Sequence, residues 1–124
     1  MKFHSRIALA LMILGLVVAS YANGLAAKTL GPPSELKLVI QGKGFLLTWK
    51  ASPDDPTTLT GYEIVRANVA SGPFQAIATV GKGILKYYDG TAHPEVIYYY
   101  KVRALADKVY SGYSNTVTGE RPGY

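Results

Sequence analysis

Apolar and polar residues alternate along residues 97–105, and this alternation predicts a β-strand. One parity is aromatic or aliphatic and the other is partly charged: Tyr98, Tyr100, Val102 and Ala104 against Tyr99, Lys101 and Arg103. A strand buried on one face has this period of two, because successive side chains point to opposite faces. We therefore place Tyr98, Tyr100 and Val102 in the core and expect Tyr99 to face outward.

Six other segments have the same pattern or are bounded by turn residues. They are residues 34–41, 45–50, 61–67, 74–80, 84–88 and 113–119. Glycine and proline separate them at intervals of about 8 to 12 residues and leave no room for a helix. Parity predicts inward side chains at Leu36, Leu38, Ile40, Phe45, Leu47, Trp49, Tyr62, Ile64 and Tyr87, and outward side chains at Glu63 and Val65.

Seven short strands without a helical period predict an antiparallel β-sandwich in a single domain of this 124-residue chain. Two small sheets can cover each other's apolar faces, whereas a single short sheet would leave one of its faces wet. An open barrel fits the same pattern less well.

The first residues have the pattern of a secretory signal over residues 1–22. Lys2 and Arg6 precede an uncharged apolar run over residues 7–19, and small residues follow. We expect cleavage after Ala22, with Ala26 or Ala27 as alternatives. An uncleaved anchor is the other interpretation, although 13 apolar residues are fewer than the roughly 20 that span a bilayer. The sequence therefore predicts a secreted, periplasmic or cell-surface protein, with no membrane span once the signal is cleaved.

Composition narrows the classes of function. The chain has no cysteine, so it cannot form disulfides or cysteine-based metal sites. Without Lys2 and Arg6, 11 basic residues face 8 acidic ones, a charge of +3. The basic residues are scattered singly, which does not indicate nucleic-acid binding. We expect no cofactor.

Motifs along residues 33–121 resemble those of a fibronectin type III module of the subtype common in secreted bacterial proteins. They are Pro33–Leu36, Leu47–Trp49, Gly61–Arg66, Ser71–Phe74, Ile77–Val80, Lys86–Asp89, Tyr98–Ala104 and Ser114–Val117. The resemblance implies an immunoglobulin-like β-sandwich with a tether over residues 23–32 and a tail over residues 122–124. It also implies a non-enzymatic module that binds or spaces other domains.

The resemblance gives Tyr98 the role of a tyrosine corner, with its ring in the core and its hydroxyl bonded to upstream backbone. Two residues depart from the family pattern, which usually has leucine at Ala92 and glycine at Glu95. We expect the corner to differ there, and the smaller side chain of Ala92 would be offset only if Val96 or Ile97 turned inward. The family's integrin-type Arg-Gly-Asp tripeptide is absent.

Candidate catalytic and metal-binding residues are few. His93 lies in a turn without a nucleophile in a recognisable arrangement, so no catalytic triad is indicated. Asp54 and Asp55, or Asp89 and Glu95, could pair for acid–base chemistry or hold calcium. Asp54 and Asp55 lack the spacing of a calcium loop and suit turn chemistry better. We expect neither catalysis nor a metal.

Exposed tyrosines are the strongest candidates for binding residues in this sequence. Tyr88, Tyr99, Tyr110, Tyr113 and Tyr124 fall outward or in loops, and aromatic faces can anchor a protein partner or stack on sugars. We select Tyr99, Tyr110 and Tyr113 as candidate contacts. The predicted function is protein–protein or cell-surface interaction through an unidentified partner.

Two alternatives stay open. One is a carbohydrate-binding module that holds a surface polysaccharide on the exposed tyrosines. The other is a subunit of an extracellular fibre or envelope complex, in which the edge strand at 34–41 pairs with a strand of another chain. Lys37 is the only residue in this strand that we expect to oppose such pairing.

Overall fold

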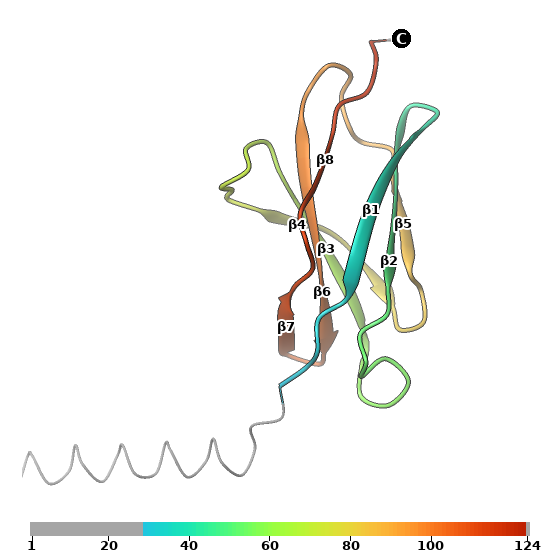
Figure 1. Cartoon of the computed structure of the whole chain (residues 1–124), viewed down its shortest axis with the longest axis vertical. Coiled ribbons are helices and arrows are strands. Elements are labelled where there is room, and N and C mark those ends of the chain that lie inside the picture. Colours follow the sequence, from blue (N-terminus) through green and yellow to red (C-terminus); the bar gives the residue numbers. More distant parts are fainter. Residues whose placement is uncertain (1–28, 124) are drawn as a thin grey trace, which may run out of the picture.

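A computed structural model describes residues 29–123, in which eight strands are connected by turns and loops (Figure 1). The strands are β1 (Ser34–Gln41), β2 (Gly44–Lys50), β3 (Gly61–Ala67), β4 (Gln75–Gly81), β5 (Lys86–Asp89), β6 (Tyr98–Ala106), β7 (Val109–Tyr113) and β8 (Val117–Gly119). The predicted signal, residues 23–28 of the predicted tether and Tyr124 lie outside the described residues.

The strands form two antiparallel sheets that face each other. One sheet has the order β1-β2-β5, and the other has the order β4-β3-β6-β7, with β8 also paired to β6. The two sheets lie on either side of the molecule in Figure 1. The prediction of an antiparallel β-sandwich is therefore confirmed.

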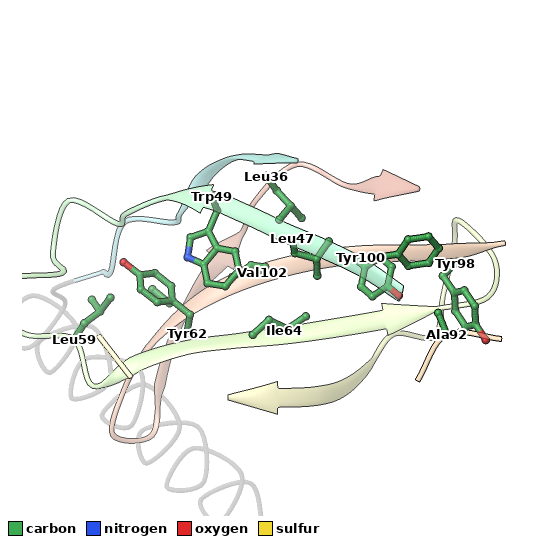
Figure 2. Close-up of a cluster of buried hydrophobic side chains, with 12 residues drawn as sticks. Leu36, Leu47, Trp49, Leu59, Tyr62, Ile64, Ala92, Tyr98, Tyr100 and Val102 are labelled. Atoms are coloured by element: carbon green, nitrogen blue, oxygen red, sulfur yellow. The ribbon is translucent and has the colours of Figure 1, made fainter. Parts of the chain in front are cut away.

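The core lies between the sheets and is rich in aromatic side chains. Figure 2 shows Trp49 and Leu47 of β2 pointing toward Tyr62 and Ile64 of β3. Trp49 and Tyr62 meet edge to face with ring centroids 5.7 Å apart, an arrangement that aromatic pairs prefer. Among the side chains predicted to face the core, Trp49, Tyr62, Tyr98, Tyr100 and Val102 are buried, and Tyr87 is half-buried against them.

The predicted last strand is divided in two. Residues 109–113, most of which were expected to form a loop, are β7, and the chain leaves the sheet before β8 begins. Serine hydroxyls complete the ladder of β6 at this break: Ser111 Oγ accepts from Ala104 N at 2.8 Å, and Ser114 Oγ accepts from Val102 N at 3.0 Å. Asn115 then turns to β1, where its amide bonds the backbone N and O of Leu36 at 2.9 and 3.0 Å.

Parity does not by itself give the burial of two side chains. Ile40 was expected inward but is 47% exposed, because it lies at the end of an edge strand beside the β1–β2 turn. Val65 lies on the outer face of the central strand β3, as expected, but it is buried there. We attribute its burial to neighbouring long side chains, since it lies directly opposite Lys101.

Several boundaries also differ from those expected. The structure starts β5 at Lys86 rather than at residue 84, and the strand includes Asp89. Leu30, expected in the tether, packs against the core, and Gly31 N donates to Asp54 Oδ2 at 2.8 Å. The packed domain therefore begins before Pro33. Among the described residues, no helix has the length and apolar character needed to cross a membrane.

Candidate functional site

The outer face of the β4-β3-β6-β7 sheet carries a row of aromatic rings and cations that alternate. Arg103 of β6 places its guanidinium carbon 3.6 Å from the centre of the Tyr110 ring and 4.9 Å from that of Tyr113. Lys101 places its ammonium 4.5 Å from the centre of the Tyr113 ring and 4.0 Å from that of Phe74. We call these five residues the cation–π ladder. Its order is Phe74, Lys101, Tyr113, Arg103 and Tyr110.

Strand pairing explains why these residues meet. Lys101 and Arg103 share the outward parity of β6, and Arg103 lies directly opposite Tyr113 of β7. Asp107 adopts a positive φ of 54° in the tight turn between β6 and β7. After this turn β7 runs back along β6, so that Tyr110 pairs with Leu105. Phe74 reaches the ladder from the opposite side, just before β4.

One acidic side chain anchors the ladder. Glu63 of β3 lies opposite Arg103, and its Oε1 accepts a hydrogen bond from Arg103 Nε at 2.8 Å. The same oxygen lies 2.8 Å from Arg103 Nη2 in the ion pair. This charge-assisted contact holds the guanidinium over the tyrosine rings. Within residues 29–123 no carboxylate forms an ion pair with Lys101, so the ladder carries one uncompensated positive charge.

The three tyrosines selected from the sequence lie on this sheet. Tyr110 and Tyr113 are 45% and 38% exposed and belong to the ladder. Tyr99 is half-buried on the same face of β6, where it pairs with Ala67 and Thr118. Sequence reasoning missed Phe74, Lys101, Arg103 and Glu63 as partners of these tyrosines. The sequence did contain a signal for two of these partners, because Lys101 and Arg103 share the outward parity of Tyr99 on the same strand.

A second polar cluster lies inside the sandwich at Asp89. Its carboxylate is fully buried and accepts from Arg66 Nη1 at 2.9 Å and from the Tyr100 hydroxyl at 2.5 Å. The Thr91 backbone N and hydroxyl donate to the other oxygen at 2.9 and 2.6 Å. The Arg66 guanidinium also lies 4.7 Å from the centre of the Tyr98 ring.

Burial and these contacts shift the pKa values of Asp89 and Tyr100. Burial alone would raise the pKa of Asp89, but the hydrogen bonds from Thr91, Tyr100 and Arg66 outweigh it and hold that pKa below its ordinary value. Burial and the adjacent carboxylate raise the pKa of the Tyr100 hydroxyl. Every oxygen of Asp89 is engaged within the protein, so the cluster is a structural ion pair rather than a reactive site.

The tyrosine corner implied by the resemblance is present. The Tyr98 hydroxyl accepts from His93 N at 2.9 Å, and the ring is buried. Glu95, which stands where the family has glycine, adopts a positive φ of 60°, the conformation that glycine favours. Ala92 is itself buried at the core's edge beside Tyr98 (Figure 2), whereas Ile97 is 47% exposed. Of the two side chains that could turn inward, Val96 does so, because it is half-buried against the core, and Ile97 does not.

The candidate aspartates of the loop between β2 and β3 are committed to structural contacts. Asp55 Oδ2 accepts from the Tyr62 hydroxyl at 2.6 Å and from Gly83 N at 3.0 Å. Asp54 binds Gly31, as described above. Asp89 and Glu95 do not pair, because Asp89 is held by Arg66. The described part of the chain has no group of three or more side chains suited to hold a metal ion.

The architecture of this domain is similar to that of known proteins. An Fn3-like protein from Clostridium thermocellum superposes with a TM-score of 0.66 and 26% identity, over 78% of this chain and 98% of that one. The domain is fibronectin type III-like. A β-1,2-glucanase from Parabacteroides distasonis contains the same fold over 13% of its length, with a TM-score of 0.65 and 21% identity. No protein-family model matches the chain.

The Fn3-like domain also matches a segment of a much longer protein. It is 37% identical over 78 residues to an amylopullulanase from Thermoanaerobacter thermohydrosulfuricus. The match covers 63% of this chain and 5% of that protein. A segment homologous to this Fn3-like domain is therefore a small part of that amylopullulanase.

Proposed function

We propose that this chain is an exported, non-catalytic accessory module that binds a protein partner through the cation–π ladder. The ladder is the observation that carries the proposal. Aromatic residues and arginine are the side chains most enriched at the energetic centres of protein interfaces. Here two exposed tyrosines and an arginine are fixed next to one another on a rigid sheet, so little conformational entropy is lost on binding.

Charge indicates the kind of partner surface. Glu63 neutralises Arg103, whereas Lys101 has no acidic partner among residues 29–123. A partner that contributes an acidic side chain next to an apolar patch would complement the ladder. Export is supported by the basic and then apolar pattern of residues 1–22. The segment shared with amylopullulanase supports an accessory role beside other domains.

The ladder favours a protein over a sugar at these tyrosines. Sugar stacking needs an open ring face, and cations lie over the rings of Tyr110 and Tyr113. The fibre alternative needs a free edge on β1, and the side-chain amide of Asn115 engages both backbone groups of Leu36 on that strand. Both observations support docking of a partner onto the outer sheet face.

A capture experiment with matched variants tests this function. The tagged protein is incubated with the exported protein fraction of its host, in parallel with a Tyr110→Ala/Tyr113→Ala double variant and a Tyr88→Ala control on the other sheet. We expect the wild type and the control to retain the same protein and the double variant to lose it. Retention by all three would contradict a role for the ladder.

The same three proteins distinguish the carbohydrate alternative. Each is run through native gels that contain amylopectin or pullulan. The proposal predicts that the double variant migrates as the wild type does in both gels. Retardation of the wild type that disappears in the double variant would instead assign Tyr110 and Tyr113 to glycan binding.

A further inference from the structure

A different tyrosine has an open ring face on the outer side of the other sheet. Tyr88 of β5 lies opposite Leu46 of β2, yet its hydroxyl donates to the backbone O of Gln41 on β1 at 2.9 Å. The order of this sheet is β1-β2-β5. The Tyr88 side chain starts on β5 and its hydroxyl is bonded to β1, and β2 lies between these two strands. The ring must therefore lie across β2 and cannot project away from the sheet.

Glycines make this position possible. A Cβ on Gly44 of β2 would lie 2.7 Å from the Tyr88 hydroxyl oxygen and 2.8 Å from its Cζ. A Cβ on Gly90 would lie 3.2 Å from Cε2, and one on Gly42 would lie 3.6 Å from the hydroxyl oxygen. The ring thus occupies space that side chains would otherwise fill. Since the ring lies over Gly44 and the residue is 42% exposed, we infer that one ring face lies against backbone and the other is open to solvent.

Three lysines share the outer side of this sheet with Tyr88. Lys37 and Lys86 lie on either side of Thr48, in a cross-strand row on the side of Tyr88 away from Gly44. Lys43 lies in the β1–β2 turn, next to Gly44. None of these three forms an ion pair with a described residue, whereas Lys50 pairs with Glu35 at 2.9 Å.

The positive charge is concentrated on this sheet. Its four lysines and Glu35 give the outer face a charge of +3. Residues 29–123 as a whole hold 10 basic and 8 acidic side chains, a charge of +2. The charges of the remainder of the described domain sum to −1, so the outer face of the β1-β2-β5 sheet can attract polyanions.

We propose that Tyr88 is a stacking platform for the sugar rings of an acidic polysaccharide, whose carboxylates pair with Lys37, Lys43 and Lys86. A fixed, flat aromatic face with a negative quadrupole suits the C–H face of a pyranose ring. A flat lysine-bearing sheet face suits an extended polymer with repeated negative charges. This site is on the opposite sheet from the ladder and does not depend on the proposed function.

Affinity electrophoresis tests the site. The full protein is run in native gels with increasing polygalacturonate, beside gels with neutral amylopectin. We expect retardation by polygalacturonate, and we expect Tyr88→Val to weaken the apparent Kd about ten-fold or more, because truncation removes the central anchor. Tyr88→Phe, which keeps the ring, is expected to bind within about two-fold of the wild type, and Lys37→Gln/Lys86→Gln is expected to bind more weakly at low salt.

Matched controls separate stacking from simple charge attraction. Val109→Ala removes an exposed apolar side chain of β7 on the other sheet and is expected to leave binding unchanged. Binding to poly-glutamate, which has charge but no sugar ring, is expected to be equal for the wild type and Tyr88→Val. The proposal is overturned if polygalacturonate does not retard the wild type, if Tyr88→Val binds it as well as the wild type does, or if amylopectin is bound as tightly.

Discussion

Arg66 of β3 and Asp89 of β5 form an ion pair of 2.9 Å that joins the two sheets inside the sandwich. Asp89 is fully buried and also accepts from Tyr100 of β6. The carboxylate therefore connects three strands at the end of the core where the tyrosine corner lies. Two of these strands, β3 and β6, also carry Glu63, Lys101 and Arg103 on their outer faces.

Replacement of Asp89 by asparagine is expected to destabilise the fold strongly. The change removes one charge of a buried pair and leaves Arg66 without its partner, which costs about 3 to 5 kcal/mol. Urea denaturation at neutral pH measures the change in the free energy of unfolding. Asp107→Asn, an exposed control, is expected to differ from the wild type by less than about 0.5 kcal/mol. Equal losses in both variants would contradict the role assigned to Asp89.

The same carboxylate predicts how stability depends on pH. The pKa of Asp89 is lowered in the folded protein, so its contribution to stability is fully present above the pKa of the unfolded chain. That contribution is lost as the pH falls below about 4 and through the folded pKa. Unfolding free energies measured from pH 7 to pH 2 are expected to fall less steeply at the acid end for Asp89→Asn than for the wild type. Parallel curves would mean that folding does not change the pKa of Asp89.

Tyr98→Phe tests the tyrosine corner. Loss of the hydroxyl leaves the backbone N of His93 without its acceptor, which costs about 1 to 3 kcal/mol. Chemical denaturation measures this loss. Tyr99→Phe on the outward parity is the control and is expected to leave stability nearly unchanged. An unaltered midpoint for Tyr98→Phe would show that the hydrogen bond does not contribute.

Glu95→Gly tests whether the departure from the family pattern costs stability. Glu95 holds a positive φ of 60°, which is unfavourable for a residue with a Cβ. Glycine relieves that cost but loses more entropy on folding, so we expect a net gain of up to about 1 kcal/mol. Thermal unfolding measures the change, with Glu120→Gly, on the exposed chain after β8, as the comparison. A clear loss of stability in Glu95→Gly would show that the glutamate side chain is needed at the corner.

Strand parity was sufficient to predict the sandwich and most of its core. Alternation identified the strands that bear Trp49, Tyr62 and Tyr98, because burial on one face imposes it. Parity gave neither the exposure of Ile40, which lies at the edge of a sheet, nor the burial of Val65 on the outer face to which parity had assigned it.

The polar clusters were harder to predict. Arg66 shares the inward parity of Tyr62, and Asp89 shares that of Tyr87, so two opposite charges at inward positions were a readable signal. Their pairing depends on how two sheets are stacked, which local sequence does not specify. The contacts of the cation–π ladder and the orientation of the Tyr88 ring depend on the pairing register of the strands and on side-chain rotamers, which the sequence pattern does not give. Sequence therefore identified the exposed tyrosines but not which of them keeps an open ring face.

Site-specific photocrosslinking tests the central claim, that the ladder face contacts a protein partner. Benzoylphenylalanine is placed at position 113, at position 110 or at position 88, and each protein is irradiated in the exported fraction of its host. The account predicts a discrete protein adduct from positions 110 and 113 and none from position 88, which lies on the opposite sheet. An adduct from position 88 alone, or equal adducts from all three positions, would contradict it.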